Sequence, residues 1–218
     1  MERGTDGAKV KAKPGIRRQR AQETRRRMLD AAFRLFTAHG YDGTTIDSIA
    51  REAGVAVQTV YFNFGNKQTI LKELVDVRVA GDDEPVPTLE RPWVLEAVAA
   101  EDPDAQLRHQ VAGAREIYER VGALLEVLRS AAVSNEDVAP LWERNKQQRM
   151  EVQRHLVKAL AEKHPLPGAL TLDRAVDISY GLLGPEMYHL LVTERGWTPR
   201  QWADWVHSSL RHHLVGQG

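Results

Sequence analysis

Apolar side chains recur at helical spacing along most of the chain. The first series occupies positions i, i+3, i+4 and i+7 and consists of Leu29, Ala32, Phe33 and Phe36. Side chains at this spacing share one face of a helix. The pattern predicts a helix over residues 24–38, followed by a glycine suited to the left-handed position after a helix end.

Two shorter helical segments follow the first. Thr44 is suited to cap a helix that contains Ile49 and Ala50. Gly54 then supplies the positive φ that a tight turn requires. A third helix is predicted to begin near Ala56. Two short helices joined by a glycine-containing turn form a helix-turn-helix unit.

The rest of the chain also has helical periodicity, and no segment alternates as a strand does. A fourth helix is predicted from Asn66 until Gly81 and two prolines interrupt it. The later predicted helices cover residues 93–100, 104–132, 136–164, 172–193 and 199–214. The sequence therefore predicts an all-α fold of about nine helices, in which a three-helix unit precedes a larger helical region.

Composition narrows the class of protein. The 218 residues are 42% hydrophobic with only 10 prolines, which supplies enough apolar material for a core and argues against disorder. The chain has no cysteine, so disulfides, thiolate zinc sites and cysteine nucleophiles are excluded. No apolar run is long enough to span a membrane and the N-terminus is charged, so we expect a soluble, cytoplasmic protein.

The balanced total charge conceals an asymmetry. Residues 1–72 contain 14 Lys and Arg against 7 Asp and Glu, although the whole chain has 30 of each sign. Much of the excess lies in residues 1–21, which we expect to form a flexible basic arm. Such an arm commonly binds nucleic-acid phosphates, and its alternative role is that of a solubilising tail.

The helix-turn-helix segment resembles a known family. Residues 40–50 (GYDGTTIDSIA), 53–55 (AGV) and 59–67 (TVYFNFGNK) are similar to the DNA-binding domain of tetracycline-repressor-type (TetR) transcriptional regulators. The resemblance implies a DNA-binding domain over residues 22–72 and a helical ligand-binding and dimerisation domain over residues 73–218.

Two positions depart from the family pattern. Ala56 stands where the family commonly has a serine or threonine that caps the recognition helix, so that cap must come from water, phosphate or another side chain. Asn63 replaces a frequent histidine and changes a polar group near the DNA backbone. The change at Asn63 need not abolish binding.

The resemblance also implies which residues contact DNA. Gln58 and Thr59 lie in the first turn of the third helix, which enters the major groove, and glutamine can pair with adenine through two hydrogen bonds. Thr45, Tyr61 and Lys67 match family positions that hold phosphates. Core packing is the alternative for Tyr61, and protein contact is the alternative for Phe62. The candidates are Arg17, Arg18, Arg20, Thr44, Thr45, Gln58, Thr59, Tyr61, Phe62 and Lys67.

The family places a small-molecule pocket among the middle helices. The resemblance therefore implies pocket walls at Trp93, Leu107, Val111, Tyr118, Leu125, Leu128, Trp142, Met150 and Tyr180. Helical periodicity does not separate a pocket wall from ordinary core, and ordinary core is the alternative for each of these side chains.

The last two predicted helices have more apolar surface than one packed face needs. The family pairs these helices with their copies in a four-helix bundle, so we expect a homodimer that presents two recognition helices to a near-palindromic operator. The candidate interface residues are Leu183, Met187, Leu190, Trp202, Val206 and Leu210. A monomer with a fully internal core is the alternative.

These observations favour a transcriptional repressor that a small-molecule effector releases from double-stranded DNA. We expect no cofactor and no enzyme activity, because the sequence has no glycine-rich phosphate loop and no nucleophile motif. One alternative is a helical DNA-binding protein without ligand control. Another is a helical metal-binding protein, but its only sequence motif is the single ExxH at residues 186–189, and di-metal carboxylate sites need two.

Overall fold

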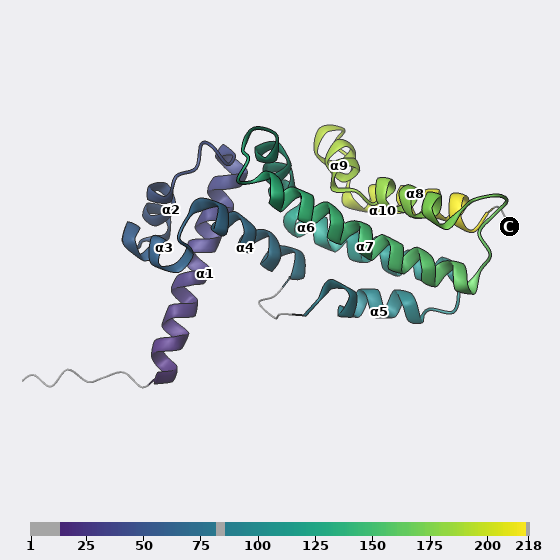
Figure 1. Cartoon of the computed structure of the whole chain (residues 1–218), viewed down its shortest axis with the longest axis horizontal. Coiled ribbons are helices and arrows are strands. Elements are labelled where there is room, and N and C mark those ends of the chain that lie inside the picture. Colours follow the sequence, from purple (N-terminus) through teal and green to yellow (C-terminus); the bar gives the residue numbers. More distant parts are fainter. Residues whose placement is uncertain (1–13, 82–85, 217–218) are drawn as a thin grey trace, which may run out of the picture.

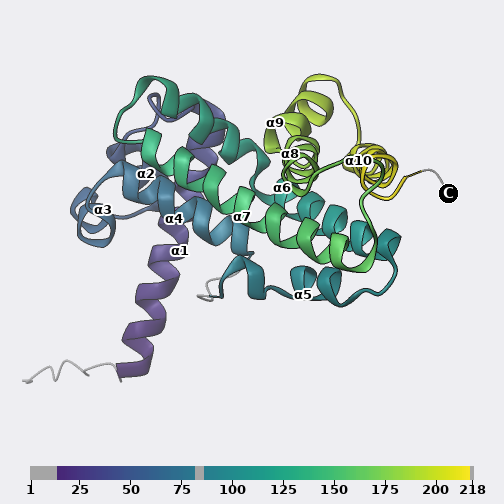
Figure 2. The ribbon, with the colours of Figure 1, turned by 45° about the vertical axis from the view of Figure 1, so that its right-hand side comes forward.

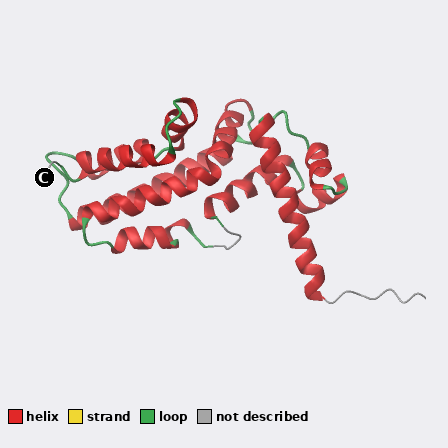
Figure 3. Cartoon of the chain, turned by 180° about the vertical axis from the view of Figure 1, so that it is seen from behind, coloured by secondary structure: helices red, strands yellow, loops and turns green. Residues whose placement is uncertain are grey.

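Helices make up all the regular structure in the described part of the chain. A computed structural model describes residues 14–81 and 86–216, and no strand occurs within these ranges (Figure 3). The α-helices are α1 (Pro14–His39), α2 (Ile46–Ala53), α3 (Val57–Phe64), α4 (Lys67–Ala80), α5 (Pro92–Ala99), α6 (Pro103–Ser134), α7 (Ala139–Lys163), α8 (Leu172–Leu182), α9 (Pro185–Tyr188) and α10 (Pro199–Leu214). A 3-10 helix, η1 (Thr88–Glu90), and a π-helical segment, η2 (His189–Glu194), occur in the connections. The predicted all-α fold is confirmed.

α2 and α4 pack on α1, and α3 packs on α2 and α4 (Figure 1). Met28 and Phe36 of α1 are buried together with Ile49 of α2 and Val60 of α3, and these side chains belong to one apolar cluster. The spacing of Met28 and Phe36 places both on the inner face of α1. The N-terminal turns of α1 project beyond this unit (Figure 1).

The long helices α6 and α7 form the centre of the larger region and run side by side (Figures 1 and 2). α5 lies along one side of this pair, and α8 and α10 lie along the other. α4 packs against both α1 and α6, so it connects the small unit to the larger one. α1 also packs directly on α6, so the larger region meets the small unit at both α1 and α4.

Helix α1 begins at Pro14, ten residues before the predicted start at residue 24. Half of residues 14–23 are Arg or Gln, which favour helix, but the segment has almost no apolar side chains. Hydrophobic periodicity therefore gave no signal there. Residues 14–21 are helical rather than part of a flexible arm, and residues 1–13 lie outside the described ranges.

The predicted helix over residues 172–193 is interrupted in the structure. α8 ends at Leu182, and Pro185 opens the short helix α9. Proline lacks a backbone N–H and its ring clashes with the preceding helical turn, so it cannot continue α8. The apolar pattern runs on across this break and concealed it. In contrast, α5 and α10 lie within one residue of their predicted limits.

Candidate nucleic-acid interface

Local hydrogen bonds define the turn between α2 and α3. Thr45 caps α2, because its Oγ1 accepts a hydrogen bond of 3.0 Å from Ser48 N while Ser48 Oγ accepts one of 3.0 Å from Thr45 N. This reciprocal pair is a capping box. Gly54 ends the helix with φ 66° and ψ 42°, a conformation that strains residues with a Cβ. The predicted turn at Gly54 is confirmed.

The cap of α2 is Thr45, and the prediction that Thr44 caps this helix is wrong. Thr44 has no exposed surface, and its hydroxyl donates a hydrogen bond of 2.8 Å to the carbonyl oxygen of Gly40. A buried, bonded hydroxyl cannot reach a DNA phosphate. The prediction that Thr44 contacts DNA is therefore wrong, whereas Thr45 is exposed beside it.

Helix α3 has one buried face and one open face. Val60 and Phe64 are buried, as expected for core residues four positions apart. Gln58 is exposed, Tyr61 is 50% exposed and Phe62 is 91% exposed. Core packing therefore does not account for Tyr61, and the open face of α3 carries an amide, a phenol and a bare aromatic ring.

Thr59 and Asn63 lie beside this open face and are partly exposed. The Asn63 side-chain amide donates a hydrogen bond of 2.7 Å to the carbonyl oxygen of Thr59 in the preceding turn. The group that replaces the family's frequent histidine is thus turned back on its own helix. The Thr59 side chain retains part of its surface for a ligand.

The N-terminus of α3 has no side-chain cap. Ala56 occupies the cap position with φ −69° and ψ 146°, and no side chain accepts a hydrogen bond from the first turn. Helix N-termini carry partial positive charge and unsatisfied N–H groups. The first turn of α3 therefore offers backbone donors that suit an anion such as a phosphate.

Lys67 has an intramolecular role that the sequence analysis did not foresee. Its Nζ donates hydrogen bonds to the carbonyl oxygens of Tyr41, at 2.7 Å, and Thr44, at 2.9 Å. The ammonium also lies 4.1 Å from the centroid of the Tyr41 ring, a cation–π geometry. Burial lowers the pKa of Lys67, and the charge of Asp42 opposes that change. Lys67 joins the start of α4 to the turn before α2, so phosphate binding is at most a second role.

The basic residues of α1 are mostly open to solvent. Arg18 and Arg20 are exposed near the start of α1, and Arg26 and Arg27 are exposed one to two turns later. The Arg17 side chain lies outside the described part of the structure. The exposed guanidinium groups suit phosphate contacts, because each can donate two parallel hydrogen bonds.

Other arginines hold the helices of this unit together. Arg25 of α1 forms an ion pair with Glu73 of α4 and lies 4.5 Å from the centroid of the Phe64 ring at the end of α3. Arg78 of α4 binds Asp30 of α1 at 2.8 Å. These contacts connect α1, α3 and α4, so the open face of α3 is carried on a braced scaffold.

Two adjoining cavities lie where α4 meets the larger region. A groove of about 800 Å³ is bordered by α4, η1, α5 and α6, and a smaller cavity of about 80 Å³ extends toward α7. They adjoin because Trp93, Ile117, Asn145 and Gln148 line both. The groove falls in the size range of small-molecule sites.

Three of the nine predicted pocket residues line these cavities. Trp93 lines both, and Tyr118 and Leu125 line the smaller one. The other six, which do not border either cavity in the described chain, are Leu107, Val111, Leu128, Trp142, Met150 and Tyr180. Leu107, Val111 and Leu128 are ordinary buried core, while the rings of Trp142 and Tyr180 lie 5.2 and 4.9 Å from the Arg149 guanidinium.

The smaller cavity has a polar wall that was not among the predicted pocket residues. Asn145, Gln148, Arg149 and Gln153, all on α7, line it. Asn145 Oδ1 accepts a hydrogen bond of 3.1 Å from Arg149 Nε. One signal was available, because Asn145 is two helical turns before the buried Val152 and so occupies the apolar face of α7. A polar side chain on such a face often serves a site.

Four of the six predicted interface residues are buried within one chain. Leu183, Trp202, Val206 and Leu210 pack in the core, and Trp202 has no exposed surface. They cannot form the contact surface of a dimer, so their assignment is wrong. The physical reason is that this face of α10 packs on α6 and α8 of its own chain. Met187 is half-buried, and Leu190 is 42% exposed.

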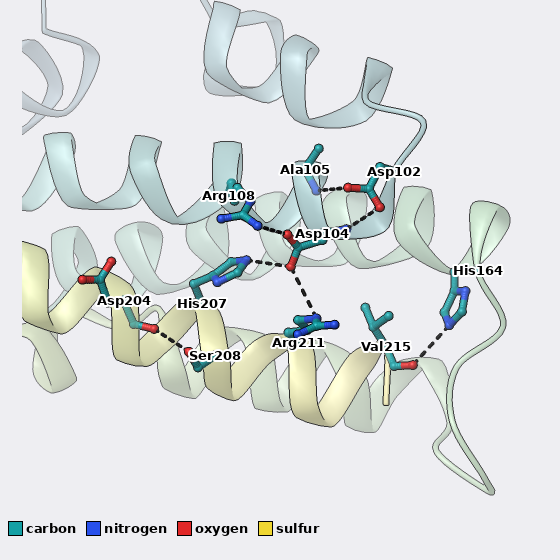
Figure 4. A network of polar contacts seen from close by, with 10 residues as sticks. All are labelled: Asp102, Asp104, Ala105, Arg108, His164, Asp204, His207, Ser208, Arg211 and Val215. Atoms are coloured by element: carbon teal, nitrogen blue, oxygen red, sulfur yellow. Dashed lines mark hydrogen bonds and ion pairs between the residues drawn. The ribbon is translucent and has the colours of Figure 1, made fainter. Parts of the chain in front are cut away.

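Two histidines near the C-terminal end lie beside acidic side chains. His207 Nε2 of α10 lies 3.0 Å from Asp104 Oδ1 at the start of α6, where Arg211 also approaches the carboxylate (Figure 4). His189 lies 3.5 Å from Glu194. Within residues 14–81 and 86–216, no three His, Asp or Glu side chains form a cluster that would hold a metal ion. None of the helices described is both long and apolar enough to cross a bilayer.

Comparison with known proteins agrees with this geometry. Residues 28–74 match the family described as bacterial regulatory proteins, tetR family. The HTH-type transcriptional regulator SrpR of Pseudomonas putida is 39% identical over 85 residues, and the match spans 38% of this chain and 40% of SrpR. The HTH-type regulator YdeS of Bacillus subtilis, itself uncharacterized, is 28% identical over 81% of this chain and 82% of its own length.

The fold extends the similarity to most of the chain. The crystal structure of the Bacillus subtilis regulator FadR in complex with stearoyl-CoA superposes with a TM-score of 0.68 at 18% identity, covering 88% of this chain and 98% of FadR. The described helices, with this turn and the exposed third helix, have the architecture of the helix-turn-helix class. Within that class, residues 28–74 belong to the tetR family of bacterial regulatory proteins.

Proposed function

We propose that this protein is a repressor that binds a near-palindromic operator as a homodimer and is released by a small-molecule effector. In this proposal, residues 22–72 bind DNA and residues 73–218 bind the effector and form the dimer. The observation that carries the proposal is the open face of α3. Gln58, Tyr61 and Phe62 are exposed there beside a helix N-terminus without a side-chain cap.

Each exposed group suits a different part of DNA. Gln58 in the first turn of α3 is the candidate reader of a base edge, because its amide can pair with adenine in the major groove. Thr59, next to Gln58, is the second candidate reader of a base edge, and Thr45 and Tyr61 carry hydroxyls suited to phosphates. Arg18 and Arg20 add charge-assisted contacts at the start of α1, and Arg17 belongs to the same proposal.

The effector site is proposed at the two cavities between α4, α5, α6 and α7. A ligand there would touch Trp93, Asn145 and α4 residues such as Val79. Because α4 also packs on α1, a ligand that fits only one position of α4 favours one spacing of the two recognition helices. A preference of about 3 kcal/mol changes operator affinity by roughly a hundredfold.

The first test is selection of DNA from a random pool by the purified protein. We expect a consensus with two inverted half-sites about one helical turn apart, because a two-fold dimer imposes its symmetry on the DNA. Tight binding with no consensus would contradict the proposal and support the alternative of a DNA-binding protein without sequence preference. The same protein should be assayed for bound metal, since stoichiometric metal would favour the metal-binding alternative.

The base-reading role of Gln58 gives a sharper prediction. Gln58→Ala should weaken binding to the selected operator by about 1–3 kcal/mol and weaken binding to a scrambled duplex much less. Tyr61→Phe removes only a hydroxyl and should weaken both duplexes similarly. Gln147→Ala on α7 is the matched control, because Gln147 is an exposed glutamine outside the DNA-binding unit and outside both cavities. Equal losses on both duplexes for Gln58→Ala would contradict a reading role.

A further inference from the structure

Phe62 is exposed to an extent that the fold does not explain. It lies in the last turn of α3 and is 91% exposed, whereas Val60 and Phe64 on the opposite face already fill the core. Burying a phenylalanine side chain contributes roughly 1.5–3 kcal/mol, and the isolated chain does not gain this contribution. The ring is therefore available to a partner.

The position of Phe62 points to DNA as that partner. Phe62 is four residues after Gln58, so both side chains lie on the same face of α3, one turn apart. This face belongs to a unit with a net positive charge, because residues 14–72, from the start of α1 into α4, contain 10 basic and 5 acidic side chains. A protein partner that covered Phe62 would also cover Gln58, and a polyanion is the better electrostatic complement.

The chemistry of the ring then restricts what it can recognise. Phenylalanine has no donor or acceptor, so it cannot bind a phosphate or pair with the polar edge of a base. The major groove displays one apolar group, the C5 methyl of thymine. A phenyl ring in contact with this methyl excludes water from both.

We propose that Phe62 determines specificity by contacting a thymine methyl group in each half-site of the operator. The inference rests on the proposed function, since it requires α3 to enter the major groove. It adds a second readout to the hydrogen bonds of Gln58. Gln58 reads one base and Phe62 reads a thymine. The two bases should lie about as far apart along the groove as one turn of α3 is long.

The test replaces single thymines of the selected operator by deoxyuridine, which pairs identically and lacks only the methyl group. One thymine in each half-site should be sensitive. Replacing that thymine in one half-site should lower the affinity of the wild-type protein about fourfold, which corresponds to ~0.8 kcal/mol for one buried methyl-sized group. Phe62→Ala should bind the thymine operator more weakly and should bind thymine and uracil operators equally. Phe62→Leu, which keeps an apolar group, should retain part of the discrimination.

Two controls separate this contact from a loss of folding or of bulk apolar surface. The melting temperature of Phe62→Ala should stay within about 2 °C of the wild type, because the ring is exposed. Val133→Ala is the matched surface variant, since Val133 is 82% exposed on α6. It should bind both operators as the wild type does.

The outcomes distinguish this inference from the proposed function. If the selected DNA has a palindromic consensus but no thymine is sensitive to loss of its methyl group, the contact does not exist and the regulator function stands. If uracil weakens the wild type and Phe62→Ala equally, another residue reads the methyl group. If Phe62→Ala binds the operator normally, the ring serves another partner. Absence of any consensus contradicts the proposed function itself.

Discussion

At the scale of single residues, Tyr118 shows how burial governs an ionisable group. The phenol lies in the core of the larger region, where its hydroxyl donates a hydrogen bond to the carbonyl oxygen of Leu183. Its ring centroid lies 5.3 Å from that of Tyr188 and 5.8 Å from that of Trp202. Burial raises the pKa of Tyr118 well above its ordinary value of 10.0, and the Arg149 charge only partly opposes this.

This pKa shift predicts a loss of stability at alkaline pH. Above pH 10, the unfolded chain releases the phenolic proton while the folded chain keeps it, so the free energy of unfolding falls as pH rises. Tyr118→Phe removes this contribution, and its stability should fall less steeply between pH 10 and 12. At pH 8 the variant should lose only about 1 kcal/mol, for one hydrogen bond. Urea unfolding at pH 8, 10 and 12 measures the free energy of unfolding of the wild type and of Tyr118→Phe. An equally steep fall with pH for both proteins would contradict the prediction.

At the scale of helices, α2 and α3 differ in how they begin. Thr45 caps α2 through a reciprocal pair with Ser48, whereas Ala56 leaves α3 without a side-chain cap. The backbone of Ala56 already has the extended conformation that a capping residue adopts. A serine at position 56 therefore requires no backbone change. A cap can be removed from α2 and added to α3, and the two effects can be compared.

We expect Thr45→Ala to destabilise the protein by about 1 kcal/mol and Ala56→Ser to stabilise it by a similar amount. In a domain of this size, each change should shift the melting temperature by roughly 2–4 °C, in opposite directions. Thermal unfolding followed by circular dichroism measures both shifts. A lower melting temperature for Ala56→Ser would show that its hydroxyl does not accept from the first turn of α3.

The end of α4 is a second element with a testable role. Arg120 of α6 donates long hydrogen bonds to the carbonyl oxygens of Arg78, at 3.4 Å, and Val79, at 3.5 Å. A cation at a helix C-terminus contributes about 0.3–1 kcal/mol. Arg120→Ala should therefore speed hydrogen exchange of the last α4 amides by about two- to fivefold. Arg129→Ala is the control, because Arg129 pairs with Glu126 of its own helix. An equal effect of both variants on the α4 amides would contradict a stabilising role of Arg120 at the end of α4.

At the scale of the molecule, the candidate dimer surface is smaller than the sequence indicated. Packing within the chain buries Trp202, Val206 and Leu210, so the apolar surface left near the C-terminal end includes Leu190 and part of Met187. These two side chains belong to α9 and η2, which lie at the outer edge of the molecule (Figure 2). A second copy of the chain would have to cover this edge.

We therefore predict that Leu190→Asp converts the proposed dimer into a monomer, because it places a charge in an interface that excludes water. Leu95→Asp is the matched control, since Leu95 is 53% exposed on α5, on the opposite side of α6 and α7. Sedimentation equilibrium gives the mass of each variant. A dimer that tolerates Leu190→Asp would mean that another surface pairs the subunits.

The sequence by itself determined the helices whose signals are local. Periodicity, caps and glycine turns act within a few residues, which is why the turn at Gly54 and the limits of α5 and α10 followed from the sequence. Local reasoning failed where a signal was absent or masked. Residues 14–23 lack an apolar face, and Pro185 breaks a helix whose apolar pattern continues.

Tertiary structure alone decided which surface each side chain meets. Thr44 and Thr45 are adjacent hydroxyls, yet only the path of the chain past Gly40 buries the first and exposes the second. Lys67 was chosen as a phosphate ligand, but its ammonium is bound by carbonyls 23 and 26 residues away in sequence. Trp202 was assigned to a dimer interface because α10 is apolar, although its own chain buries it. Burial depends on contacts between residues distant in sequence, and one helix's periodicity shows that a face is apolar without showing what covers it.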